Sequence, residues 1–284
     1  RASQNTPPLR SLRVTTTPGA DAASTIRYAV DGAVATITLN RPRAANAQNS
    51  QMIEELDTAF DRADADDDVR VIVLGAEGKH FSAGHDLKEL LAGEEHWSAL
   101  RVTPEGKLRH EQVMYFDKLV KIRDLRKVTI AAVQGTCSAA GLMLACMCDL
   151  IVAADDARFS NPVLRMSGVG VELLVEPWEL GPRKAKEFLF CAQEFGAVDA
   201  ERYGLVNRVV PRSELEAAAR AMAEQVALVP PLTAEAVKAS INHMVDGMVS
   251  ASRGATTSCS TSSSRTHRPR SPRWRRASPA AWTR

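Results

Sequence analysis

The sequence predicts an α/β fold, in which a largely parallel sheet is covered by helices. Two observations carry this prediction. Short runs of β-branched and other apolar residues, of which residues 128–133 are the clearest, have the composition of fully buried strands. These runs alternate along the chain with segments whose apolar residues recur at helical spacing, and such alternation favours parallel pairing of the strands.

The individual elements follow from the same patterns. Strands are expected at residues 26–28, 33–39, 69–74, 128–133 and 150–154, with further short elements at 199–203 and 205–210. Helices are expected at residues 50–65, over most of 90–127 with a break near Thr103-Pro104, from Leu142 onward, and at 182–190, 213–228 and 231–247. Asp31-Gly32 predicts a hairpin between the first two strands. The first helix has one apolar face, formed by Met52, Ile53, Leu56, Ala59 and Phe60.

Length and composition limit the possible functions. A chain of 284 residues with 45% hydrophobic content can bury one large core or two modest ones. No apolar run approaches the roughly 20 residues of a membrane span, and the first residues lack the apolar centre of a secretory signal. Five cysteines predict reduced thiols in a cytoplasmic protein, and Cys146 and Cys148 are expected to be buried rather than to hold a metal.

The ends of the chain differ from its middle. We expect residues 1–24 to form a disordered leader, 25–195 an α/β core, 196–248 a helical C-terminal subdomain, and 249–284 a disordered basic tail. The tail holds eight arginines and no acidic residue, so residues 1–248 carry a net charge of −6, which argues against a nucleic-acid partner. The tail is either a basic arm for anionic partners or a passenger without a role, and the absence of a repeated basic pattern favours the passenger.

Two segments have the composition of a strand, a turn of small residues and the start of a helix. The first is Val128–Asp149, with Ser138-Ala139-Ala140-Gly141 at its turn, and the second is Lys79–Glu89, with Ser82-Ala83-Gly84. Small side chains let another molecule approach the backbone, and N–H groups at such a turn can bind an oxyanion. Taken alone, the first segment is more readily interpreted as an ordinary strand-to-helix corner, because such corners are common in α/β folds.

Together with three other motifs, the pair resembles the crotonase (enoyl-CoA hydratase/isomerase) superfamily. The other motifs are Asn40-Arg41-Pro42 with Asn46-Ala47, then Phe159-Ser160-Asn161-Pro162, and Gly204-Leu205-Val206-Asn207. The resemblance runs from about Ile26 to Met248. It implies a crotonase-like spiral of βα repeats with a C-terminal helical region, which assembles as a trimer or a dimer of trimers.

The resemblance also implies a site. The N–H groups of His85 and Ala140 would hold the thioester oxygen as an enolate forms, and the segment 90–127 would line the acyl pocket. The substrate would be an acyl-CoA or enoyl-CoA thioester, with coenzyme A as part of the substrate and no permanent cofactor or metal. The residues implied in contact with it are Arg43, Ala44, Ala83, His85, Asp86, Leu87, Lys88, Ala140 and Gly141. Arg43 is otherwise a solvated loop charge, and the imidazole of His85 is expected to point into solvent.

Proton transfer is where the chain departs from the pattern. The hydratases of the family use two glutamates, and the matching positions here hold Met143 and Val163, neither of which can transfer a proton. Glu172 is the nearest acidic replacement, and an equally good reading is a carboxylate paired with an arginine, either Arg165 or Arg183. Glu176 and Glu179 are weaker candidates.

The resemblance therefore implies an enoyl-CoA hydratase/isomerase family protein without the usual hydratase pair. Three functions stay open. They are weak hydration, another reaction of the family (isomerase-type) with Glu172 as the proton carrier, and acyl-CoA binding without catalysis. No nucleic acid or membrane is expected as a partner.

Overall fold

The structure is a computed structural model that describes residues 24–92, 103–166 and 175–256. Glu172, the predicted leader up to residue 23 and the predicted tail from residue 257 lie outside the described residues. The chain divides into two compact units, residues 1–242 and 243–284, and each is described by itself.

A six-stranded sheet forms the centre of the first unit. Its strands are β1 (Ile26–Asp31), β2 (Val34–Leu39), β3 (Val71–Ala76), β4 (Val128–Val133), β6 (Leu150–Ala154) and β9 (Arg208–Val210). They lie side by side in the order β1-β2-β3-β4-β6-β9. The β1–β2 hairpin is antiparallel and every other neighbouring pair is parallel, which confirms the predicted α/β class.

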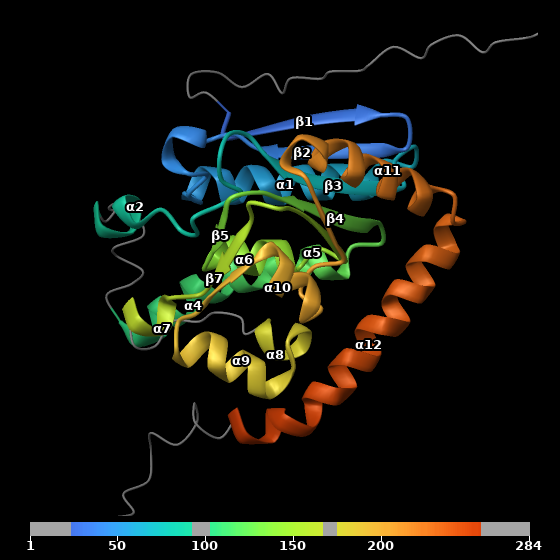
Figure 1. The fold of residues 1–284 in the computed structure, drawn as a ribbon. Coiled ribbons are helices and arrows are strands. Elements are labelled where there is room, and N and C mark those ends of the chain that lie inside the picture. Colours follow the sequence, from blue (N-terminus) through green and yellow to red (C-terminus); the bar gives the residue numbers. More distant parts are fainter. Residues whose placement is uncertain (1–23, 93–102, 167–174, 257–284) are drawn as a thin grey trace, which may run out of the picture. The chain divides into compact units, whose positions relative to one another are not determined.

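Helices pack around this sheet (Figure 1), and alternate strand residues enter two different layers of core. On one face, Val73, Ile130 and Val152 pack with Leu215 and Ala219 of helix α11 (Leu215–Ala227). On the opposite face, the intervening strand residues pack against α1 (Ser50–Ala65), α5 (Asp117–Asp124) and α6 (Ala140–Cys146). Burial on both faces explains why these strands read as nearly continuous apolar runs.

A second sheet of three short strands was not predicted. It consists of β5 (Thr136–Ser138), β7 (Arg158–Ser160) and β8 (Glu194–Gly196), in the order β5-β7-β8. Three-residue strands carry too few side chains to show an alternating pattern, so the sequence gives no period to detect. The first of these strands leads directly into the turn that precedes α6.

The remaining helices lie between and after these strands. They are α2 (Leu87–Ala92), α4 (Pro104–Glu111), α7 (Val163–Met166), α8 (Glu176–Glu179), α9 (Gly181–Phe190), α10 (Ala197–Arg202) and α12 (Pro231–Thr256), with 3-10 turns η1 (Pro42–Ala44) and η3 (Arg212–Glu214). A π-helical turn, η2 (Gln112–Phe116), joins α4 to α5. The last helix continues eight residues beyond the predicted start of the tail, because Ala, Ser, Met and Val in residues 248–253 do not interrupt it.

The part of α12 that belongs to the first unit is fixed by a buried ion pair. Lys238 Nζ lies 2.8 Å from Asp149 Oδ2 and donates to the carbonyl oxygen of Lys127. Asp149 also accepts hydrogen bonds from the backbone N–H and the hydroxyl of Thr129. Asp149 thus links the end of α6, strand β4 and α12.

Cys137, Cys146 and Cys148 are free and buried. Burial raises the pKa of the Cys148 thiol to about 12 and moves those of Cys137 and Cys146 upward as well. These thiols are therefore neutral and behave as small hydrophobic side chains, as predicted. None of the described helices is both long and apolar enough to cross a bilayer.

Candidate functional site

The two small-residue segments singled out in the sequence lie side by side. Ser82 is bridged to β5 in the parallel sense, because its N–H donates to the carbonyl of Thr136 and its carbonyl accepts from the N–H of Ser138. The contact joins two turns that are more than 50 residues apart in the sequence. It places the Ala83-Gly84-His85 stretch against the Ala139-Ala140 turn.

Two glycines allow this approach. A Cβ added to Gly84, where φ is +97°, would lie 3.0 Å from the Cβ of Ala139 and 3.2 Å from the backbone nitrogen of Ala140. A Cβ added to Gly141 would lie 2.5 Å from the carbonyl oxygen of Ser82. The predicted need for small residues therefore has a physical cause, which is direct contact between the two backbones.

The backbone of His85 is directed by its neighbour Gln48. The backbone N–H of Gln48 donates to the carbonyl of Gly84, and the backbone carbonyl of Gln48 accepts from the N–H of Asp86. Gln48 and His85 therefore form a parallel bridge. In such a bridge the C=O of Gly84 and the N–H of Asp86 point toward Gln48. The N–H and C=O of His85 itself point away from Gln48.

Ala139 has a strained backbone. Its φ of 50° and ψ of −122° lie in a region that non-glycine residues rarely adopt. The turn is held by the N–H of Ala139, which donates to the carbonyl of Ser160, and by a 2.9 Å hydrogen bond between the hydroxyls of Ser138 and Ser160. Ala140 follows as the first residue of α6, where an N–H group has no carbonyl partner within its own helix.

A third segment, Arg41–Ala47, packs against the outer side of this pair. The guanidinium of Arg41 lies 2.9 Å from the carboxylate of Asp86 and also donates to the carbonyl of Ala47. Burial would raise the pKa of Asp86, but the hydrogen bonds from Arg41 and from the N–H of Lys88 outweigh it, and the pKa is lowered. Asp86 is therefore ionised at neutral pH and fixes the loop before α2.

The residues implied to contact coenzyme A lie on these three segments. Arg43 and Ala44 are exposed in the turn η1, and Leu87 and Lys88 are exposed at the start of α2. Ala83 joins the two groups, because its N–H donates to the carbonyl of Ala45. The predicted contact residues thus lie on three neighbouring segments, whereas Glu172, the predicted proton carrier, lies outside the described residues.

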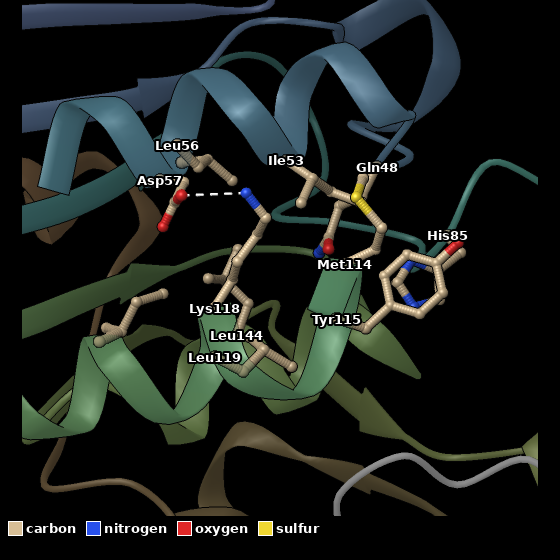
Figure 2. Close-up of a pocket in the computed structure, with 11 residues that line it drawn as sticks. Gln48, Ile53, Leu56, Asp57, His85, Met114, Tyr115, Lys118, Leu119 and Leu144 are labelled. Carbon is tan, nitrogen blue, oxygen red and sulfur yellow. Dashed lines mark hydrogen bonds and ion pairs between the residues drawn. The ribbon is translucent and has the colours of Figure 1, made fainter. Parts of the chain in front are cut away.

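A pocket lies beside this meeting point, between α1 and the continuous helix formed by α4, η2 and α5 (Figure 2). Its wall is mostly apolar and includes Ile53 and Leu56 of α1, Met114 and Leu119 of the opposite helix, and Leu144. Leu144 lies one turn after Ala140 on α6. The pocket and the small-residue turn therefore share one helix.

Charged residues line one end of the pocket. Asp57 of α1 lies 2.9 Å from Lys118 Nζ and also pairs with Lys121, while Lys118 reaches Glu54. Burial opposes the charge on both Asp57 and Lys118, but their mutual contacts dominate, so the pKa of Asp57 is lowered and that of Lys118 is raised. These groups keep their charges near neutral pH and hold α1 to α5.

The side chain of His85 does not point into solvent, as the sequence predicted, but lines the pocket. Its ring lies 4.1 Å from the ring of Tyr115, measured between centroids, with an interplanar angle of 36° (Figure 2). His110 meets the edge of the same tyrosine at 5.6 Å. The prediction was wrong because residues 30 positions away supply an aromatic surface that local sequence around His85 does not reveal.

With this geometry established, comparison with known proteins identifies the family. The model of the enoyl-CoA hydratase/isomerase family matches residues 29–268. The chain belongs to that family. This result confirms the resemblance and the crotonase-like fold, and it makes the chain a member of a family of enzymes.

Individual family members agree with this assignment. EchA13 of Mycobacterium tuberculosis, which carries an enoyl-CoA hydratase name, is 43% identical over 238 residues, 78% of this chain and 75% of EchA13. A short-chain-enoyl-CoA hydratase of Clostridium acetobutylicum is 33% identical and aligns over 75% of this chain and 78% of its own length. The crystal structure of a probable enoyl-CoA hydratase from Mycobacterium smegmatis has a TM-score of 0.74 and 48% identity, covering 80% of this chain and 87% of that one.

The described residues include several positions considered for proton transfer. Met143 is 1% exposed on α6, and Val163 begins α7. Glu176 is fully buried, and its Oε1 accepts a 2.6 Å hydrogen bond from Asn161, the residue before Pro162. Burial raises the pKa of Glu176 more than the hydrogen bond from Asn161 lowers it. Its burial with Asn161 favours a structural role.

Proposed function

We propose that this chain binds acyl-CoA or enoyl-CoA thioesters and stabilises a thioester enolate between the N–H groups of His85 and Ala140. The observation that carries the proposal is the contact of Gly84 with Ala139 and Ala140. It brings the two N–H groups to adjoining segments, and the Gln48 bridge leaves the N–H of His85 directed away from Gln48. Two backbone donors aimed at a developing oxyanion are a strong catalytic device.

The rest of the thioester has room on either side of these donors. The acyl chain enters the apolar pocket between α1 and α5, whose aliphatic wall matches a hydrocarbon chain. The nucleotide end lies over η1 and the start of α2, where Arg43 and Lys88 are exposed and can meet phosphates. Two relatives carry enoyl-CoA hydratase names, and these names support this class of substrate.

The reaction is better described as enolate chemistry than as ordinary hydration. In the hydratases of the family, two glutamates activate water and deliver a proton to carbon, and this chain has Met143 and Val163 at the matching positions. A reaction that moves one proton to and from carbon, such as isomerisation, needs a single base. We therefore place this chain among the isomerase-type members, with hydration weak.

Binding of butyryl-CoA tests the proposal. Titration calorimetry with the wild-type protein is expected to show binding, and Ala140→Pro, which removes one of the two donors, is expected to weaken the binding of an enolate analogue such as acetoacetyl-CoA by about 10-fold or more. A thermal melt shows whether the variant is folded. Undiminished binding of acetoacetyl-CoA by a folded Ala140→Pro variant would place the oxyanion site elsewhere.

We also infer that a second copy of this chain covers part of α12. Five large apolar side chains are exposed over a stretch of 14 residues in the first unit, and they are Leu228, Val229, Leu232, Val237 and Ile241. Apolar stripes of this kind mark interfaces, and the family resemblance implies trimers. Sedimentation analysis is expected to give an oligomer that Leu232→Asp with Ile241→Asp dissociates, whereas a wild-type monomer would contradict the inference.

A further inference from the structure

We propose that the imidazole of His85 carries the proton to and from the α-carbon of the bound thioester, with Tyr115 as its positioning residue. This inference rests on the proposed function, because it requires the thioester oxygen to be held by the N–H of the same histidine. It assigns to one residue both a backbone donor and a side-chain base.

The first support is the position of the ring. The side chain of His85 faces the pocket rather than the loop surface, and both ring nitrogens are buried (Figure 2). The backbone of His85 is bridged to Gln48, and its ring packs on Tyr115. The α-carbon of a thioester is bonded to the carbonyl carbon whose oxygen the backbone N–H would hold. A ring attached to the same residue as that N–H is therefore close to the carbon that loses the proton.

The second support is that the ring is held in place. Tyr115 is 9% exposed and packs on His85 with the centroids 4.1 Å apart. His110, which is 7% exposed, packs on Tyr115 with an interplanar angle of 88°. A chain of three packed rings restricts the rotation of the imidazole, and a fixed base transfers protons more effectively than a mobile one.

The third support is the chemistry of the other pocket residues. Among the described lining residues, Asp57 and Lys118 are the charged ones, and their ion pairs hold each in its charged form near neutral pH. Most of the rest are aliphatic, and Gln48 does not titrate. A histidine ordinarily titrates near pH 6.5, so it can accept and release a proton under neutral conditions. His85 is thus the lining residue best suited to the task.

The proposed step balances as follows. The neutral imidazole of His85 accepts a proton from the α-carbon, so that the C–H bond breaks and an N–H bond forms. The electron pair moves onto the thioester oxygen, which the two backbone N–H groups stabilise as an enolate. The imidazolium then returns a proton to carbon, either at the α-position or, in an unsaturated enolate, at the γ-position. Return at the γ-position shifts the double bond.

Exchange of the α-hydrogens of butyryl-CoA in D₂O tests the step without assuming a natural substrate. Mass spectrometry follows the gain of deuterium with the full-length wild type, with His85→Ala, which keeps the backbone N–H, and with His85→Gln, which also keeps most of the side-chain volume. His243→Gln is the matched control, because His243 is exposed and lies outside the pocket. Calorimetry with butyryl-CoA and a thermal melt accompany each variant.

We expect the wild type and His243→Gln to exchange deuterium equally, and both His85 variants to be slower by about 10²-fold or more while still binding butyryl-CoA. Added imidazole should restore part of the exchange in His85→Ala, because the free base can occupy the space left by the ring. A merely structural histidine would not be rescued in this way.

Other outcomes overturn the inference and leave the proposed function standing. They are wild-type rates of exchange in His85→Gln and a loss in His85→Ala that imidazole does not restore. Binding of butyryl-CoA by the wild type without exchange would overturn the inference together with the enolate chemistry of the proposed function. A wild type that fails to bind butyryl-CoA at all would instead contradict the proposed function itself. Tyr115→Ala, in contrast to Tyr115→Phe, should slow the exchange, since only the former removes the packed ring.

Discussion

Gly141 and Ser82 approach so closely that a Cβ on the glycine would lie 2.5 Å from the serine's carbonyl oxygen and 2.8 Å from its Cβ. The contact is made by backbone that cannot move without breaking the bridge between Ser82 and β5. The first residues of α6 and the loop before His85 therefore form one rigid unit.

Gly141→Ala should consequently destabilise the protein despite the better helix propensity of alanine. We expect a loss of about 1–2 kcal/mol in the free energy of unfolding, measured by urea denaturation, together with weaker butyryl-CoA binding. Gly247→Ala is the control, because a Cβ there meets nothing within 4 Å and should stabilise the helix slightly. Equal effects of the two substitutions would show that the close approach is not rigid.

The Arg41–Asp86 pair should give a stability that depends on pH. The pKa of Asp86 is lower in the folded protein than its ordinary value of 3.8, so the pair stabilises the fold above that value and its contribution disappears as the pH falls through the folded-state pKa. Arg41→Gln should cost about 1 kcal/mol at pH 7. The difference from the wild type should shrink progressively below about pH 4, as followed by urea denaturation across pH.

The control for this experiment is Arg27→Gln. Arg27 pairs with Glu77 at 3.0 Å, but the side chains are 60% and 44% exposed, so its removal should change the free energy of unfolding by less than about 0.5 kcal/mol. A wild-type advantage over Arg41→Gln that persists undiminished at pH 2.5 would rule out the ion pair as its source.

Lys238→Met should destabilise the first unit strongly. The ammonium group is 6% exposed, and its loss leaves the carboxylate of Asp149 without its cation. Removing one partner of a buried pair typically costs about 3–5 kcal/mol. Adding Asp149→Asn to Lys238→Met should recover part of this loss, because the uncompensated charge is then gone. Lys107→Met, at an exposed pair, should be nearly neutral.

The wild type should hydrate crotonyl-CoA poorly, and Met143→Glu with Val163→Glu should increase hydration. General acid–base groups contribute about 10²–10⁴-fold, but the gain should be near the lower limit, because Met143 is buried and a carboxylate there resists ionisation. The loss of the crotonyl-CoA absorbance measures the rate. The matched variant, Met143→Gln with Val163→Gln, should show no gain. Efficient hydration by the wild type would mean that another group activates water.

The sheet and most helices could be predicted because their sequence signals are local. Residues 50–65, 128–133 and 150–154 coincide with α1, β4 and β6, where apolar periodicity extends over a whole element. The start of α6 was placed two residues late, at Leu142, because Ala140 and Gly141 resemble the small residues of the turn. The strained backbone of Ala139 ends the turn at a point that composition does not mark.

Residues of the candidate site could be predicted from the sequence only at positions where backbone atoms, rather than side chains, form the site. Gly84, Ala140 and Gly141 are small because two segments of the backbone are in contact there. Small residues in a strand-turn-helix pattern can be recognised in a sequence. The environment of His85 was missed because Tyr115 belongs to a distant helix. Which side chains of that helix face the pocket depends on the number of residues in each of its turns. The helical spacing of apolar residues does not reveal a turn that contains an extra residue.

The π-helical turn at Gln112–Phe116 determines which residues of this helix face the pocket. It holds one residue more per turn than an α-helix, so shortening it by one residue would rotate the following helix by about 100° relative to α4. Met114 and Tyr115 lie within the turn and face the pocket. The identity of the ring that His85 meets is therefore set by chain length as well as by side-chain type. Among related chains, insertions and deletions at this position would alter selectivity as effectively as substitutions.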